Sequence, residues 1–143
     1  MLLFYSCGAS GSEEYSDTQL SPEQAEVKQL ELQVLQIHDE VMPEMGTLVT
    51  LKDKVEAKNS QLEESGDSQA HDQVIVNSMV ISNLDEAHEA MMQWMRDFHK
   101  VDIEEDPAKN LQYLEQEKQE ILYVQDQVHK AITAAEETLG TRK

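Results

Sequence analysis

The chain has 143 residues, and 29 acidic side chains against 11 lysines and arginines give it a net charge of -18. This charge repels phosphate backbones, so we expect no nucleic-acid partner, and favours cations or a basic protein surface. With 39% hydrophobic residues the chain is too apolar for wholesale disorder, and its 5 glycines and 3 prolines are too few for the turns of an all-β fold. The length suits one domain, so the composition predicts an all-α fold.

The first seven residues, MLLFYSC, end in the only cysteine of the chain. One cysteine excludes an internal disulfide and a Cys-based zinc site. The segment resembles the end of a bacterial lipoprotein signal peptide, in which an apolar run closes on the cysteine to be lipidated. Phe4 replaces the commoner leucine, Tyr5 is bulky and no basic region precedes them. We therefore expect residues 1-7 to be a signal remnant and Cys7 to carry the lipid anchor. The alternative is a frayed apolar N-terminus with a free thiol.

Residues 8-20 are small, polar and acidic, and they predict a flexible tether. Ser21, with Pro22 and Gln24 after it, predicts a capped helix start. The following heptad pattern predicts one helix as far as about Glu63, kinked where Pro43 removes a backbone hydrogen bond. Its expected seam is Val27, Leu30, Val34, Ile37, Val41, Leu48, Leu51, Val55 and Leu62, interrupted by Glu44 and Lys58.

A turn around Gly66 leads to a second helix that starts at Asp67 or Ser68, and Asp106-Pro107 predicts the start of a third. Because the turns are short, consecutive helices should be antiparallel, giving an up-down-up three-helix bundle or long helical coiled coil over residues 21-143. The second expected seam is Val80, Leu84, Ala87, Met91, Trp94, Phe98 and Val101. The third, which stops at Gly140, is Leu111, Leu114, Ile121, Val128, Ile132, Ala135 and Leu139, interrupted by Lys118 and Gln125.

One spacing, His-x3-Met-x2-Met, occurs twice within these helices. On a helix it places the three side chains on one narrow stripe, and pairing the first two helices about Gly66 brings the two stripes level on one flank. His99 extends the second stripe by one turn. The candidate metal ligands are His38, Met42, Met45, His88, Met92, Met95 and His99.

Thioether and neutral imidazole ligands select Cu(I), so a soft-metal site with Cu(I) is one interpretation of this cluster. Haem ligation by one histidine and one methionine is a weaker variant. The interpretation that we favour is packing without a cofactor, because methionine stripes on helices usually fill core gaps beneath a third helix. His71 and His129 stand on polar stretches and should be solvated.

Enzymatic interpretations fail on the details of the motifs. His88-Glu89 begins like the zinc-protease motif HExxH, but Met92 occupies the position of the second histidine. No glycine-rich phosphate loop or nucleophile-base spacing is present, so we assign no catalytic residue. The acidic run before Pro107 lacks the ligand spacing of a calcium loop and is explained by the start of a helix.

Four segments together resemble a group of short helical lipoproteins of Bacteroidota, often labelled after a viral A-type inclusion protein. They are Cys7 with its preceding run, HDEVMPEMGTLVTLK (38-52), AHEAMMQWMRDF (87-98) and YLEQEKQEI (113-121). The resemblance implies a coiled-coil fold and a cell-envelope location, on the periplasmic side or at the outer membrane, without an activity. We therefore expect a lipid-anchored, non-enzymatic structural or protein-interaction module, with Cu(I) binding as the alternative function.

Overall fold

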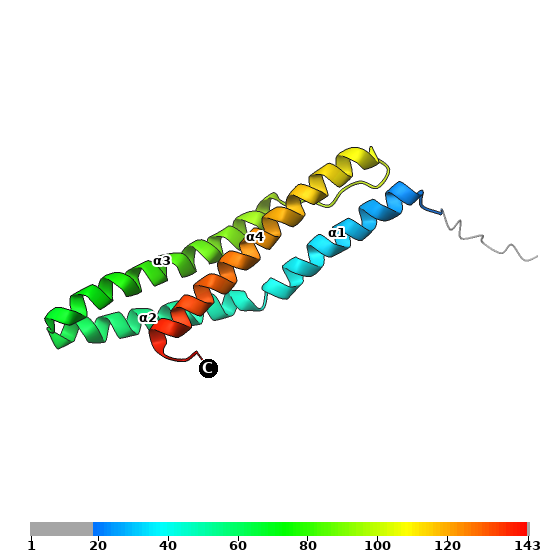
Figure 1. Ribbon diagram of the computed structural model, residues 1–143. Helices are drawn as coiled ribbons and strands as arrows, with labels where there is room; N and C mark the ends of the chain where they lie inside the picture. The colour runs from blue at the N-terminus through cyan, green and yellow to red at the C-terminus, as the bar shows by residue number, and fades with distance from the viewer. Residues whose placement is uncertain (1–18, 143) are drawn as a thin grey trace, which may run out of the picture.

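The computed structural model describes residues 19-142, so the expected signal remnant and most of the expected tether lie outside the described residues. Four helices follow in order: α1 (Pro22–Val41), α2 (Glu44–Ser65), α3 (Ser68–Asp97) and α4 (Pro107–Leu139). The first two are consecutive pieces of one arm, α3 returns antiparallel to them, and α4 runs parallel to the first arm (Figure 1). The all-α, up-down-up bundle is thus confirmed, and the described residues contain no strand.

Local capping determines where the helices begin and end. Ser21 forms a reciprocal capping box with Gln24. The carboxylates of Asp67 and Asp106 accept hydrogen bonds from the backbone N–H groups of Gln69 and Ala108, respectively. Gly66 and Gly140 close α2 and α4 with φ of 63° and 70°, a left-handed conformation that glycine adopts without steric cost. These starts and stops are those that the sequence predicts.

The prediction of one continuous first helix is wrong at Pro43. The chain makes a turn at residues 42-43 and restarts at Glu44, with the backbone N–H of Met45 donating to the Met42 carbonyl at 3.2 Å. Proline has no N–H to bond back along the helix, so the break loses little backbone hydrogen bonding. It also lets the two pieces choose different neighbours, since α1 packs mainly on α4 whereas α2 packs mainly on α3.

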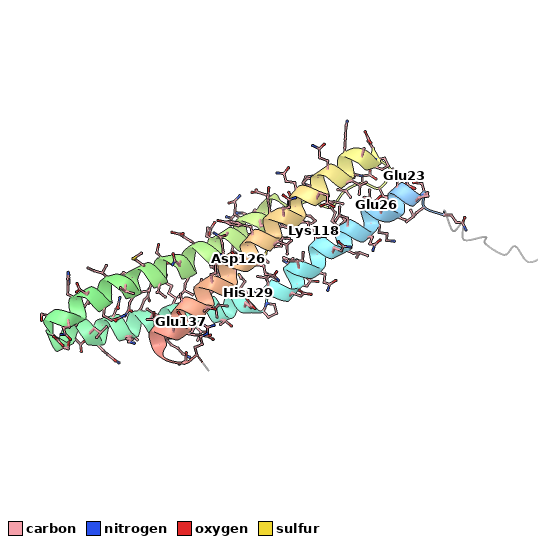
Figure 2. The ribbon with its side chains drawn as sticks, in the orientation of Figure 1. Glu23, Glu26, Lys118, Asp126, His129 and Glu137 are labelled. Carbon is pink, nitrogen blue, oxygen red and sulfur yellow. The ribbon has the colours of Figure 1, made fainter. Side chains whose placement is uncertain are left out.

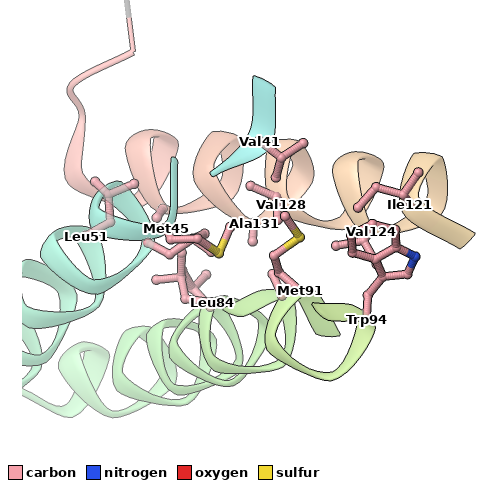
Figure 3. Close-up of a cluster of buried hydrophobic side chains, with 14 of the residues drawn as sticks. Val41, Met45, Leu51, Leu84, Met91, Trp94, Ile121, Val124, Val128 and Ala131 are labelled. Atoms are coloured by element: carbon pink, nitrogen blue, oxygen red, sulfur yellow. The ribbon is translucent and has the colours of Figure 1, made fainter. Parts of the chain in front are cut away.

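The main core runs along the contact between α2, α3 and α4, and Figure 3 shows its central part. Most residues of the first two predicted seams are buried there, including Val41, Leu84 and Met91. Near the start of α1 lies a second, smaller cluster formed by Val27, Leu30 and Leu114. Phe98 touches both clusters, so the apolar interior is continuous along the bundle.

The predicted seam of α4 needs a correction. Leu114, Ile121, Val128 and Ala135 are buried as expected. Three predicted positions are only half-buried, namely Leu111, Ile132 and Leu139, and four other side chains are buried instead: Asn110, Glu117, Val124 and Ala131. The reason is that α4 contacts both arms. Ala131 faces α3 beside Ala87, whereas Lys118 reaches α1. The buried positions from Asn110 to Ala135 alternate at spacings of four and three, so the buried face of α4 is rotated relative to the predicted seam.

Polar contacts align α4 with the first arm. The Lys118 ammonium donates to the Gln33 amide oxygen at 2.8 Å, His129 Nε2 lies 3.2 Å from Glu44 Oε1, and the Lys58 ammonium donates to the Thr138 carbonyl at 2.5 Å. Figure 2 shows Lys118 and His129 on the side of α4 nearest α1 and α2. The contacting residues of α4 and of the first arm follow the same order along the chain, as expected for parallel helices.

The α2–α3 hairpin contains a buried amide pair that the sequence pattern does not predict. Asn77 is fully buried, and its Nδ2 donates to Asn59 Oδ1 at 2.7 Å. The Oδ1 atom of Asn77 accepts a hydrogen bond from Gln73 Nε2 at 2.8 Å, so the amide oxygen and nitrogen of Asn77 are both hydrogen-bonded. A shift of the two helices would leave these buried amides without partners, so we expect the pair to favour the observed register of the hairpin.

Candidate functional site

The three candidate ligands of the first arm lie on either side of the break at Pro43. His38 is half-buried near the end of α1, and its Nδ1 lies 2.9 Å from Asp39 Oδ1. Met42 packs against the main core from outside, and Met45 is buried within it beside Leu84 (Figure 3). Met45 was expected on the flank of the helix. Because the helix breaks at Pro43, the Met45 side chain turns into the core. It is buried where the heptad pattern would have placed Glu44.

The candidate ligands of the second arm point into different surroundings. His88 lines a groove between α2 and α3 together with Lys52. Met92 is half-buried, and Met95 is exposed. His99 lies beyond the end of α3, where its Nδ1 is 3.1 Å from the Tyr113 hydroxyl and its ring stacks on the tyrosine ring.

The two His/Met motifs nevertheless lie at the same level of the bundle. The ring centroid of His38 is 5.6 Å from that of Trp94, the residue next to Met95. Several candidate side chains are used in packing or in hydrogen bonds. Within residues 19-142, no group of three or more His, Cys, Asp or Glu side chains is placed to hold a metal ion. Methionine thioethers are not among these four side-chain types, and a copper titration can test whether they bind a metal ion.

If the methionines form a Cu(I) site, the double variant Met42→Leu with Met92→Leu should abolish binding of about one Cu(I). Leucine nearly conserves the volume of methionine, so the expected loss of stability is less than about 1.5 kcal/mol. A competition titration with a Cu(I) chelator measures the binding. Met79→Leu, on an exposed turn of α3 away from both motifs, is the matched control. Absence of Cu(I) uptake by the unmodified protein would end the metal interpretation and leave packing.

A continuous aromatic stack joins the ends of α3 and α4. Trp94 stacks on Phe98 with ring centroids 4.8 Å apart, and Phe98 stacks on Tyr113 at 6.4 Å. The Tyr113 hydroxyl accepts a hydrogen bond from the backbone N–H of His99 at 3.0 Å. The stack therefore fastens the loop after α3 onto α4, and burial raises the pKa of Tyr113.

Glu117 is the unusual residue beside this stack. It is only 7% exposed, and neither its Oε2 nor the indole N–H of Trp94 has a hydrogen-bond partner among the described residues. Burial raises the pKa of Glu117, the charge of Glu120 raises it further, and the nearby Trp94 N–H lowers it only in part. The sequence carries no signal for this acid, because Glu117 looks like any other charged position on a helix.

A shallow groove of about 460 Å³ lies between α3 and α4. Trp94 and Val124 form its floor, and the exposed ring of Tyr123 stands at its rim. The remaining lining is mainly amide and carboxylate side chains from both helices, such as Gln93 and Gln116. A second groove, of about 340 Å³, lies between the same two helices beside Ala87 and Ala131.

A different surface stands out near the α2–α3 turn. Residues 73-84 contain no charged side chain over 12 consecutive positions, the longest such run in the described part of a chain that is 28% charged. This segment also exposes Ile75, Val76 and Met79, which are 51%, 50% and 64% accessible. We call Ile75, Val76 and Met79 the tip face. Heptad spacing does not reveal this face, although the absence of charge is visible in the sequence.

No helix in the described part of the chain is both long and apolar enough to cross a membrane. Cys7, the expected lipidation site, lies outside the described residues. Comparisons of the chain with protein-family models, with curated proteins and with solved structures returned no match.

Proposed function

We propose that this protein is a lipid-anchored, non-enzymatic helical lipoprotein of the cell envelope that acts as a structural or protein-interaction module. The observation that carries the proposal is the position of the two ends of the rod. The start of α1, which continues from the expected tether, and the α2–α3 turn lie at opposite ends of the bundle (Figure 1). An anchor at Cys7 would therefore hold the tip face far from the membrane.

The dimensions and the charge of the rod support this arrangement. At 1.5 Å per residue, the 30 residues of α3 extend about 45 Å. The net charge of -18 disfavours contact of the helices with anionic lipid headgroups. The protein would thus stand away from the membrane, attached by its tether, with the apolar side chains of the tip face near the distal end.

A binding role also agrees with how the polar side chains are used. His38, His99 and His129 each have a neighbouring side chain that engages a ring nitrogen, namely Asp39, Tyr113 and Glu44. Glu117 is enclosed by the core. These polar groups thus contact other side chains of the bundle, and we assign no catalytic step to them.

The anchor is tested by replacing Cys7 with serine in a chain expressed behind a complete signal sequence. We expect the variant to move from the membrane fraction to the soluble fraction, because stable attachment needs two or more acyl chains, which a serine cannot receive from lipoprotein processing. Fractionation and mass spectrometry of the N-terminal peptide measure the change. Ser6→Ala, which keeps the cysteine, is the control. Unchanged membrane association of Cys7→Ser would refute the anchor.

Cu(I) handling is our second candidate function. It is favoured by one observation, the level placement of His38 beside Trp94, which brings the two His/Met motifs to the same height along the hairpin. The two functions differ in a direct observable, because a copper handler gains thermal stability from Cu(I) whereas an interaction module does not.

A further inference from the structure

The larger groove between α3 and α4 is lined by negative charge. Asp97 of α3 and Glu120 of α4 both line it, and none of its described lining residues is basic. Residues of two antiparallel helices lie level when their numbers add to a constant, which Ala87 and Ala131 set for this pair of helices. Asp97 and Glu120 are therefore level to within one residue, so the two carboxylates stand on opposite sides of one end of the groove.

Each of these carboxylates is held by a glutamine of its own helix. Gln93 Nε2 donates to Asp97 Oδ2 at 2.7 Å, and Gln116 Nε2 donates to Glu120 Oε1 at 2.9 Å. An amide supplies no positive charge. Arg96, which donates to the Gln93 amide oxygen at 2.7 Å, forms its ion pair elsewhere on α3. No ion pair of the described residues includes Asp97 or Glu120.

A third carboxylate, that of Glu117, lies near this pair. Burial raises the pKa of Glu117, and the charges of Glu120 and Asp97 raise it further, whereas His99 opposes them in part. Because charges influence each other mainly within about 10 Å, the three acids form one group. Glu117 is only 7% exposed, and its Oε2 has no hydrogen-bond partner among the described residues. This end of the groove therefore has a negative potential that favours a cation.

The spacing of the three carboxylates does not suit a metal ion. Calcium and magnesium need oxygen ligands at about 2.0–2.6 Å, and no three acidic or histidine side chains within residues 19-142 converge in this way. An organic cation with an apolar chain matches the groove better. Trp94 and Val124 give it an apolar floor beside the acidic end (Figure 3). Tyr123, 63% exposed at the rim, adds an aromatic face that attracts an ammonium group.

We propose that the groove between α3 and α4 binds a lysine side chain of a basic partner segment. The aliphatic part of the lysine lies on Trp94 and Val124, and its ammonium group reaches the carboxylates of Asp97 and Glu120. The net charge of -18 draws such a segment toward the bundle. The inference rests on the proposed interaction-module function and names the partner as a basic segment of another protein.

Lysine suits this groove better than arginine. A guanidinium group binds best when it pairs with both oxygens of one carboxylate. In Asp97 and in Glu120, one of the two oxygens already accepts a hydrogen bond from a glutamine. An ammonium group is a compact charge that needs only one oxygen from each carboxylate.

The test titrates the full-length chain carrying Cys7→Ser, which can hold no lipid anchor, with a capped nine-residue peptide that contains three lysines spaced by glycine and serine. Trp94 is the single tryptophan of the chain and forms the floor of the groove, so its fluorescence should change on binding. Isothermal titration calorimetry measures the dissociation constant. We expect binding that weakens as the salt concentration rises, and none by the same peptide with acetylated lysines.

Neutral variants locate the binding. Asp97→Asn with Glu120→Gln should raise the dissociation constant by about tenfold or more, because the lysine loses both of its carboxylate partners. Asp72→Asn with Glu115→Gln is the matched control, since it removes one exposed charge from each of the same two helices outside the groove. The control should change the dissociation constant by less than about twofold.

The aromatic rim is tested separately at Tyr123. Tyr123→Leu removes the ring and should raise the dissociation constant by about threefold or more. Tyr123→Phe keeps the ring and should weaken binding less. Equal weakening by the two substitutions would overturn the role of the aromatic face.

Three results would overturn the proposal. The first is absence of binding by the lysine peptide at low salt, and the second is equal weakening by the two pairs of neutral variants, because net charge would then attract the peptide. The third is groove-dependent binding of spermidine without binding of the peptide, which would make the occupant a free polyamine. Tighter binding of an arginine version of the peptide would overturn the choice of lysine.

The outcome is separable from that of the anchor experiment. If the chain with Cys7 proves not to be anchored while the peptide binds as expected, the membrane attachment fails and the lysine site stands. An anchored chain whose Cys7→Ser form does not bind the peptide refutes the lysine site alone.

Discussion

Leu114→Ala should lower the free energy of unfolding by about 2–5 kcal/mol, the range for removing a fully buried leucine from a core. Leu114 is 0% exposed and joins Val27 and Leu30 in the small cluster between α1 and α4. Phe98, Val101, Leu111 and Tyr113 pack around this cluster, and how far they can collapse into the cavity determines where in this range the loss falls. Since domains of this size are stable by about 5–15 kcal/mol, the loss is a large fraction of the total. Urea denaturation followed by circular dichroism measures it.

Leu122→Ala is the matched control for this experiment. Leu122 lies on the same helix and loses the same atoms, but it is 43% exposed. Its replacement should cost less than about 1 kcal/mol, as is usual for positions near the surface. Equal losses at the two leucines would mean that α4 is rotated relative to the arrangement described above.

Glu117→Gln should raise the free energy of unfolding at pH 7 by about 1–2 kcal/mol, because an ionised carboxylate is buried there without full hydrogen bonding. Glutamine keeps the shape of the side chain and removes the charge. Few substitutions of a native residue stabilise a protein, so the sign of the effect is distinctive. Urea denaturation at several pH values measures the difference between the two proteins.

The pH dependence follows from the raised pKa of Glu117 in the folded state. A carboxyl whose pKa is higher when folded than when unfolded binds its proton more tightly in the fold, so protonation stabilises the native protein. This stabilisation is complete below the ordinary pKa of a glutamate, about 4.5, which applies to the unfolded chain. It is lost as the pH rises through the pKa that Glu117 has in the folded protein. The advantage of glutamine should therefore shrink or vanish at pH 4.

Glu115→Gln provides the control, because Glu115 is exposed on the same helix. It removes the same charge from the chain and should change stability by less than about 0.5 kcal/mol. A gain at Glu115 equal to that at Glu117 would attribute the effect to net charge. A loss of stability in Glu117→Gln would mean that the carboxylate is stabilised in the core by an interaction that glutamine cannot replace.

The sequence spacing predicts where the candidate ligands lie along the bundle, whereas neighbouring helices determine the surroundings of each side chain. The spacing of the two His/Met motifs predicts their common level, and His38 beside Trp94 agrees with it. The environment of each side chain could not be predicted, because Met45 turns into the core only once the chain breaks at Pro43. The tip face likewise depends on where α4 stops along the hairpin.

The sequence by itself determined the helical class, the capped starts at Ser21 and Asp106, the start at Asp67 or Ser68 to within one residue, the glycine stops and the up-down-up order. These features depend on residues close together in the chain, whose hydrogen bonds and dihedral preferences are local. The first two seams were predictable for the same reason, since alternating three- and four-residue spacings identify one apolar face.

Only the tertiary structure decided the rotation of α4, the break at Pro43 and the pairing of Asn59 with Asn77. The α4 sequence offers two adjoining stripes, and the one that contains Glu117 is chosen because α4 must face α3 as well as the first arm. A proline permits a break without requiring one, and here α1 and α2 pack mainly on different helices. Such outcomes depend on summed packing between segments far apart in the chain, for which local sequence carries no signal.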